Sequence, residues 1–174
     1  MDLHRLGLFV HVAAILGLFA ALAIEWVALR SLARATSYEQ SREWTRVLRM
    51  LPAIGAPSLV AALLSGIYLA TSLGAWRLSW VAVAIPTLVI VAVAGGLTAP
   101  ARNRMRQMLI GSVGALPNAV QAQLSQTFWR RSLRLRTALL SGLVFEMTVR
   151  PEAGVWVIGG VAVLGLAWGA VLRS

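Results

Sequence analysis

Four stretches of the chain are almost wholly apolar and long enough to cross a bilayer, which takes about 20 helical residues. They cover approximately residues 6–29, 52–74, 78–100 and 154–172. Runs of this length and polarity are typical of transmembrane helices, because a helix pairs its own backbone groups where lipid offers no hydrogen-bond partner. The pattern therefore predicts an all-α fold, a polytopic transmembrane helix bundle.

A fifth segment, approximately 133–150, is less regular. Its uncharged part, 137–145, is too short to span a membrane by itself. It becomes a span if Arg134 and Arg136 extend their side chains to the inner membrane surface and Arg150 extends to the outer one. We therefore expect about five spans. The alternative is a re-entrant or interfacial helix here, which leaves four.

The polar stretch before the second span predicts an amphipathic helix over approximately 38–50. Its apolar residues recur at helical spacing, and its arginines share another face. Two favourable i,i+3 pairs are predicted, Glu39 with Arg42 and Glu43 with Arg46. We expect this helix to lie on the inner leaflet, where anionic lipid attracts the arginines, and to turn into the second span at Pro52.

A second polar stretch, approximately 102–130, is too rich in Gln, Ser and Asn to lie in lipid. The pair Pro117–Asn118 is typical of a helix start, so we expect a helix from about Ala119 to run into the fourth span. No Ser/Gly linker, repeat or low-complexity tract divides the chain. We therefore expect residues 1–174 to form one transmembrane domain.

Composition agrees with this prediction and excludes several kinds of chemistry. Hydrophobic residues make up 59% of the chain and charged residues only 13%, which is too few to cover a water-soluble surface. There is no cysteine, so disulfides, thiolate metal sites and cysteine nucleophiles are excluded. The sequence contains no Walker, GxGxxG, HExxH or GxSxG motif, which argues against an ATP-driven pump or a membrane hydrolase.

The charges indicate the orientation of the bundle. The net charge is +10, and all sixteen basic residues are arginines. In the five-span scheme, all of them except Arg5, Arg77 and Arg150 fall on one side. Since cytoplasmic connections carry the excess of basic residues, this predicts an N-out, C-in topology, and it explains the basic balance without nucleic acid. Absence of lysine is typical of a GC-rich genome, which indicates a bacterial inner-membrane protein.

The two histidines lie on one face of the first span. His4 lies near the outer surface, and His11 lies two turns deeper, within the apolar run. A polar residue at that depth is a candidate functional residue, because placing it in lipid is unfavourable. Its imidazole could ligate haem, carry a proton or bond a quinone. The alternative is a neutral histidine that hydrogen-bonds a neighbouring helix.

Two glutamates are the other candidates for a ligand site or proton pathway. Glu146 either pairs with Arg150 at the outer rim or faces the bundle interior close to His11. Glu25 lies on nearly the same helix face as His11 but at the cytoplasmic end, where we expect a salt bridge at the rim. If Glu25 is unpaired, the alternative is a polar line through the bundle with His11 at its other end.

Small residues at four-residue spacing predict close helix packing. Gly165 and Gly169 form a GxxxG motif in the last span, and Ala13, Gly17 and Ala21 form a similar stripe in the first. We expect these stripes to pack within the bundle. The alternative is a homodimer seam.

The segment from His4 through His11 to Ala13, Ala14 and Gly17 resembles the first helix of several small bacterial membrane-protein families. They include the copper-resistance D type and the membrane-embedded protoporphyrinogen oxidase type. In the latter, a first-helix histidine is associated with haem, so the resemblance implies a haem-ligand role for His11 alone. The closing segment 145–151 is similar to segments of uncharacterised bacterial membrane proteins.

These observations together favour a non-enzymatic membrane component. We expect either a small-ligand binder or transporter, or an accessory subunit of a membrane complex, with the anionic inner leaflet as a partner and a homo-oligomer as an option. The alternative is a haem-binding redox protein using His11, with a methionine or a second copy's histidine as the other ligand. A quinone-linked or porphyrin-modifying enzyme is the third hypothesis.

Overall fold

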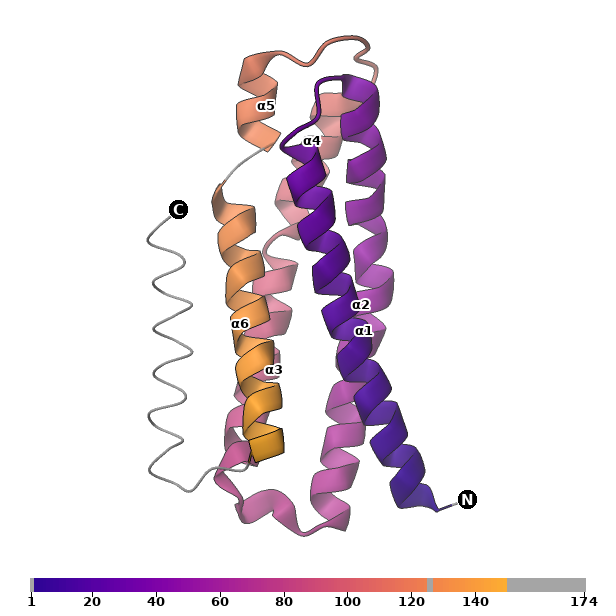
Figure 1. Cartoon of the computed structure of the whole chain (residues 1–174), viewed down its shortest axis with the longest axis vertical. Helices are drawn as coiled ribbons and strands as arrows, with labels where there is room; N and C mark the ends of the chain where they lie inside the picture. Colours follow the sequence, from indigo (N-terminus) through magenta and orange to yellow (C-terminus); the bar gives the residue numbers. More distant parts are fainter. Residues whose placement is uncertain (1, 125–126, 150–174) are drawn as a thin grey trace.

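The computed structural model describes residues 2–124 and 127–149, and this part of the chain is helical, without a β-strand. Figure 1 shows long helices running side by side. In chain order the elements are α1 (Leu3–Leu32), α2 (Tyr38–Ser72), the 3₁₀ turn η1 (Ala75–Arg77), α3 (Ser79–Gly96), α4 (Ala99–Leu109), α5 (Asn118–Leu124) and α6 (Thr127–Val149).

Three helical stretches are long and apolar enough to cross a membrane: Leu3–Leu32, Tyr38–Ser72 and Val81–Leu109. They contain the first predicted span, 6–29, and most of the second and third, 52–74 and 78–100. At 1.5 Å per residue, the 30 residues of α1 and the 35 of α2 measure about 45 and 52 Å, more than a hydrocarbon core of about 30 Å. Both helices are therefore longer than such a layer is thick. The last predicted span, 154–172, lies outside the described residues.

The helix expected over 38–50 does not turn at Pro52. In the structure it is the first third of α2, which continues through Pro52 and Pro57 to Ser72. Prolines are tolerated inside membrane helices because neighbouring groups can satisfy the freed carbonyls. The sequence-based prediction of a separate helix on the leaflet surface therefore differs from the structure, because the segment is continuous with the helix of the second predicted span.

The expected helix over 102–130 is also divided differently. Helix α4 ends at Leu109, a loop follows, and α5 begins at Asn118, as the Pro–Asn pair predicted. Helix α6 then covers Thr127–Val149, while residues 125–126 lie outside the described part. The fourth predicted span, 133–150, thus corresponds to the larger part of α6.

Small residues bring α1 and α2 together. A Cβ atom added to Gly17 would collide with the Ser58 hydroxyl, and one added to Gly55 would lie 3.8 Å from the Ala21 Cβ atom. Helix backbones approach closely at such positions, which favours dispersion contacts between them. The packing role predicted for Gly17 and Ala21 is therefore confirmed, whereas Ala13 is exposed. Gly165 and Gly169 lie outside the described residues.

The alternation of helices collects the arginines at one end of the bundle. The α1–α2 connection, α4, α5 and the beginning of α6 lie at the upper end in Figure 1, while the N-terminus, η1 and the end of α6 lie at the lower end. We call the upper end the arginine end. The buried residues Trp129, Leu32, Leu48 and Leu109 form a packed core there, so this end is folded rather than a set of loose connections.

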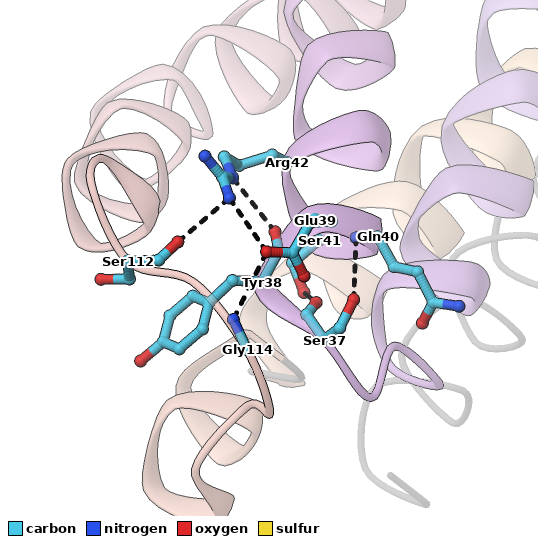
Figure 2. Close-up of polar contacts among 8 residues, drawn as sticks. All are labelled: Ser37, Tyr38, Glu39, Gln40, Ser41, Arg42, Ser112 and Gly114. Atoms are coloured by element: carbon cyan, nitrogen blue, oxygen red, sulfur yellow. Dashed lines mark hydrogen bonds and ion pairs between the residues drawn. The ribbon is translucent and has the colours of Figure 1, made fainter.

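The loop between α4 and α5 is fastened to the first turn of α2 (Figure 2). Arg42 Nη2 donates to the Ser112 carbonyl at 3.0 Å, and the Tyr38 amide donates to the Gly114 carbonyl at 3.1 Å. Glu39 accepts from Arg42 at 3.4 Å, which confirms this predicted pair, and from the Gly114 amide at 3.4 Å. The other predicted pair, Glu43 with Arg46, is not among the ion pairs of the described residues. Gly114 has φ +92°, a conformation that favours glycine. These contacts fix the α4–α5 loop beside the start of α2.

Candidate functional site

A cavity of about 400 Å³ lies between α1, α2 and α3, toward the end of the bundle opposite the arginine end. Its wall is mostly apolar, and its polar or polarisable groups come from His4, His11, Trp76 and Met147. Ligand sites of roughly 300–1,000 Å³ with few polar groups are typical of small-molecule binding. The prediction that the two histidines share a face is confirmed, because both line this cavity.

His11 is held in one orientation by α2. Its Nδ1 atom lies 3.1 Å from the Ala62 carbonyl and 3.0 Å from Ser65 Oγ. A carbonyl only accepts, and the Ser65 hydroxyl donates to the Ala61 carbonyl one turn earlier. Nδ1 therefore carries the proton and donates. In the neutral imidazole this leaves the lone pair on Nε2, which has no hydrogen-bond partner among the described residues.

Gly66 makes room for the imidazole. A Cβ atom added at Gly66 would lie 3.2 Å from His11 Cε1 and 3.6 Å from Nδ1. A larger residue would press on the ring and disturb its bonds to α2. The cradle for His11 therefore consists of the Ala62 carbonyl, the Ser65 hydroxyl and the bare backbone at Gly66.

His4 and Trp76 line the part of the cavity that is farthest from the arginine end. His4 Nδ1 is 3.5 Å from Ser72 Oγ, a long and weak contact, and the Trp76 indole donates to Thr71 Oγ1 at 3.1 Å. Trp76 is about half exposed. These two side chains therefore form the mouth of the cavity, with His11 deeper inside.

Glu146 lies in the bundle interior but not in the cavity wall. Its side chain is buried, and Oε2 has no hydrogen-bond partner within the described residues. Arg150, its predicted partner at the rim, lies outside those residues. No hydrogen bond joins Glu146 to His11, and the neighbouring Met147 lines the cavity instead. The structure thus gives Glu146 the interior position without the predicted meeting with His11.

Glu25 forms a buried ion pair with Arg136. The Arg136 Nη2 and Glu25 Oε1 atoms are 2.7 Å apart, and both side chains are less than a tenth exposed. Arg136 Nε also donates to the Ser132 carbonyl at 3.3 Å. The prediction of a salt bridge is confirmed, but its location at the rim is wrong, because the pair lies between α1 and α6 inside the bundle. The polar-line hypothesis required an unpaired Glu25, and this condition is not met.

Arg136 also departs from its predicted direction. We expected it to extend to the membrane surface, yet it turns inward because Glu25 supplies a countercharge there. Arg102, half-buried on α4, is an electrostatic neighbour of both residues and donates to Thr98 Oγ1 at 2.7 Å. All three charged groups line a second cavity of about 330 Å³, whose wall is otherwise mostly apolar.

The sequence identified the candidate residues His11, Glu25 and Glu146 but not the residues that contact them. Ser65, Gly66 and Met147 come from segments that read as ordinary apolar spans, and no spacing rule links them to His11. Arg102 read as one of many basic residues in a connection. A signal was present only for Arg136, since an arginine inside a span needs an acid, and Glu25 is the acid at the matching depth.

A comparison with known protein families, curated proteins and solved structures finds no match for this chain. The resemblance of the first helix to the copper-resistance D and protoporphyrinogen oxidase types therefore stays a prediction.

Proposed function

We propose that this chain is a multi-pass protein of a bacterial inner membrane, with five spans and an N-out, C-in topology. Three helices of spanning length and the collection of arginines at one end support the proposal. Helix α6 is the fourth span in this scheme. The ion pair with Glu25 offsets the charge of Arg136, which otherwise makes α6 an unfavourable membrane helix. The segment 154–172 is the fifth.

Topology is tested with single cysteines, since the chain has none of its own. Asp2→Cys and Ser174→Cys are labelled in intact cells with a membrane-impermeant maleimide. The proposal expects label at position 2 only, and label at position 174 only after the membrane is permeabilised. Label at both positions in intact cells means an even number of spans and contradicts the five-span scheme.

We further propose that the protein is a non-enzymatic binder of a small apolar molecule that carries a hydrogen-bond donor, such as an alcohol or phenol. The observation that supports this most is the fixed orientation of His11. Because Nδ1 donates to α2, the free Nε2 atom is an acceptor on the wall of an apolar cavity. Such a site suits a standalone binder or transporter, and also an accessory subunit that holds a ligand for a membrane complex.

Photolabelling tests this binding site directly. The purified protein is irradiated with 3-azioctanol, a photoreactive alcohol, and labelled residues are located by mass spectrometry. Labels are expected on the cavity segments of α1, α2 and α3, with a clear loss in His11→Phe and in Ile85→Trp, which fills the cavity. The matched control Val89→Trp, one turn further on an exposed position of α3, should label like the parent. Equal labelling of both tryptophan variants would refute the site.

Haem binding is the second candidate, because His11 and Met147 line the same cavity. Histidine and methionine are a known pair of axial haem ligands, and a histidine ligand commonly donates its other ring nitrogen to a backbone carbonyl, as His11 does to Ala62. When bound, the haem would supply one-electron redox chemistry, while this chain would hold and orient it. The donor atoms present fit the group, although no cluster of three metal-ligating side chains occurs among the described residues.

An absorption spectrum separates the two candidates. Protein made with added haem precursor is purified, and spectra are recorded before and after dithionite. A Soret band that shifts on reduction, is lost in His11→Ala and is altered in Met147→Leu would establish the haem protein. A spectrum without visible bands would leave the binder of a small apolar molecule as the function.

A further inference from the structure

A groove of about 330 Å³ runs between the first turns of α2 and helix α4 at the arginine end. Its wall carries five arginines, Thr45 and Asn103, but no aspartate or glutamate. We call it the arginine groove. Its basic residues are Arg42, Arg46, Arg49, Arg102 and Arg106.

Most of this charge is not neutralised by the protein. Arg42 reaches Glu39 and the Ser112 carbonyl, and Arg102 reaches Thr98. Arg46, Arg49 and Arg106 make no hydrogen bond or ion pair with any other residue that the structure describes. Guanidinium groups that converge without an acid repel one another, so this groove suits a polyanion. The planar donor fork of arginine matches the oxygens of phosphate and of carboxylate groups, and phosphate brings the larger negative charge to a groove of several guanidinium groups.

The groove adjoins the second cavity described above. Arg102 and Pro52 belong to the walls of both, so the strongly basic groove passes directly into a mostly apolar space of similar volume between α1, α2 and α3. A soluble phosphate compound would use only the groove. A molecule with a phosphate head and an apolar tail would use both.

The position in the bundle agrees with such an amphiphile. The apolar cavity lies beside uncharged parts of α2 and α3, and the groove lies where α2 and α4 are rich in arginine. The contacts in Figure 2, above all those of Arg42 with Ser112 and of Glu39 with Gly114, hold the α4–α5 loop against the start of α2, beside the groove. The site is therefore built by the fold and is not a scatter of surface charge.

We propose that the arginine groove and the adjoining cavity bind one anionic phospholipid, with its phosphate head on Arg46, Arg49 and Arg106 and an acyl chain beside Pro52 and Ala92. This site is separate from the His11 cavity, at the other end of the bundle. The bound lipid would contact both α2 and α4 and belong to the leaflet on the side of the arginine end.

Binding is measured by native mass spectrometry of the detergent-solubilised full chain with dioctanoyl phosphatidic acid. The double variant Arg46→Gln/Arg106→Gln should weaken binding by about tenfold or more, because charge-assisted phosphate contacts are among the stronger hydrogen bonds. The matched control Arg77→Gln/Arg104→Gln removes the same charge outside the groove and should change the affinity by less than about twofold. Single substitution of Arg49 by Gln is a milder variant, for use if the double variant does not fold. Equal weakening in the control would mean diffuse attraction and would overturn the site.

A second comparison tells a lipid from a soluble phosphate compound. Ala92→Phe fills the apolar cavity, and Val93→Phe places the same ring on an exposed position of α3 outside it. Ala92→Phe should weaken phosphatidic acid binding and leave inorganic pyrophosphate binding unchanged, while Val93→Phe should affect neither. If pyrophosphate binds as tightly as phosphatidic acid and Ala92→Phe changes neither affinity, the groove serves a soluble phosphate ligand and the lipid proposal is wrong.

Discussion

Removing the acid of the buried charge cluster should destabilise the bundle more than removing its main arginine. Glu25 pairs with Arg136 at 2.7 Å, and Arg102 is an electrostatic neighbour of both. In Glu25→Gln, two arginines share a buried site without a countercharge. In Arg136→Met, the glutamate keeps Arg102 as a nearby cation. The asymmetry follows from two cations and one anion sharing a site.

The magnitudes follow from the burial of the pair. Breaking a buried ion pair by removing one partner costs about 3–5 kcal/mol of unfolding free energy, and we expect this range for Glu25→Gln. Arg136→Met should cost about 1.5–3 kcal/mol, close to the value of one charge-assisted hydrogen bond. The double variant should be less destabilised than the sum of the two single variants, since it removes both members of the pair.

The assay is equilibrium unfolding in mixed detergent–SDS micelles, followed by far-UV circular dichroism. Glu43→Gln and Arg104→Met change exposed charges and should shift the unfolding free energy by less than about 0.5 kcal/mol. If Arg136→Met costs as much as Glu25→Gln, Arg102 does not share the carboxylate. If neither variant differs from the exposed controls, the reasoning from burial fails.

The remaining predictions concern packing, topology and the loop. Gly17→Ala should lower the unfolding free energy of the bundle by about 1–3 kcal/mol, because the added methyl group meets Ser58. Gly96→Ala has open space around the added atom and should be neutral or slightly stabilising. Unfolding in mixed micelles measures both variants. In intact cells, Thr36→Cys should not be labelled by an impermeant maleimide, whereas Ser72→Cys should be labelled. The reverse labelling pattern would indicate the opposite topology. Gly114→Ala, at φ +92°, should cost about 1–2 kcal/mol and loosen the α4–α5 loop, measured as faster amide exchange at the start of α2.

Hydropathy alone was sufficient to predict the helical bundle, because lipid-facing helices are apolar all round and need no partner to be recognised. It failed at the ends of spans. The segment 38–50 has the amphipathic pattern of a surface helix, and the same pattern serves a helix end that packs against its neighbours. Local sequence does not separate the two, since the choice depends on what lies beside Ser41, Thr45 and Leu48, which are buried in the structure.

For the candidate site, the sequence identified individual residues better than the contacts between them. His11 and Glu25 stood out because polar groups in an apolar run are rare, and that rarity is a property of the sequence. Their partners are Ala62, Ser65 and Arg136, separated from them by up to 111 positions in the chain. No periodicity carries information across such distances.

The sequence by itself therefore determined the helical class, the position of the apolar segments and the unequal distribution of arginines between the two sets of connections. These depend on the solvation of each residue, which its own chemistry largely sets. The tertiary structure alone decided that Glu25 meets Arg136 inside the bundle, that His11 donates to α2 and leaves Nε2 free, and that five arginines converge on one groove. These depend on which helix faces come together, and in lipid that choice is made by packing, because hydrophobicity does not distinguish one apolar face from another.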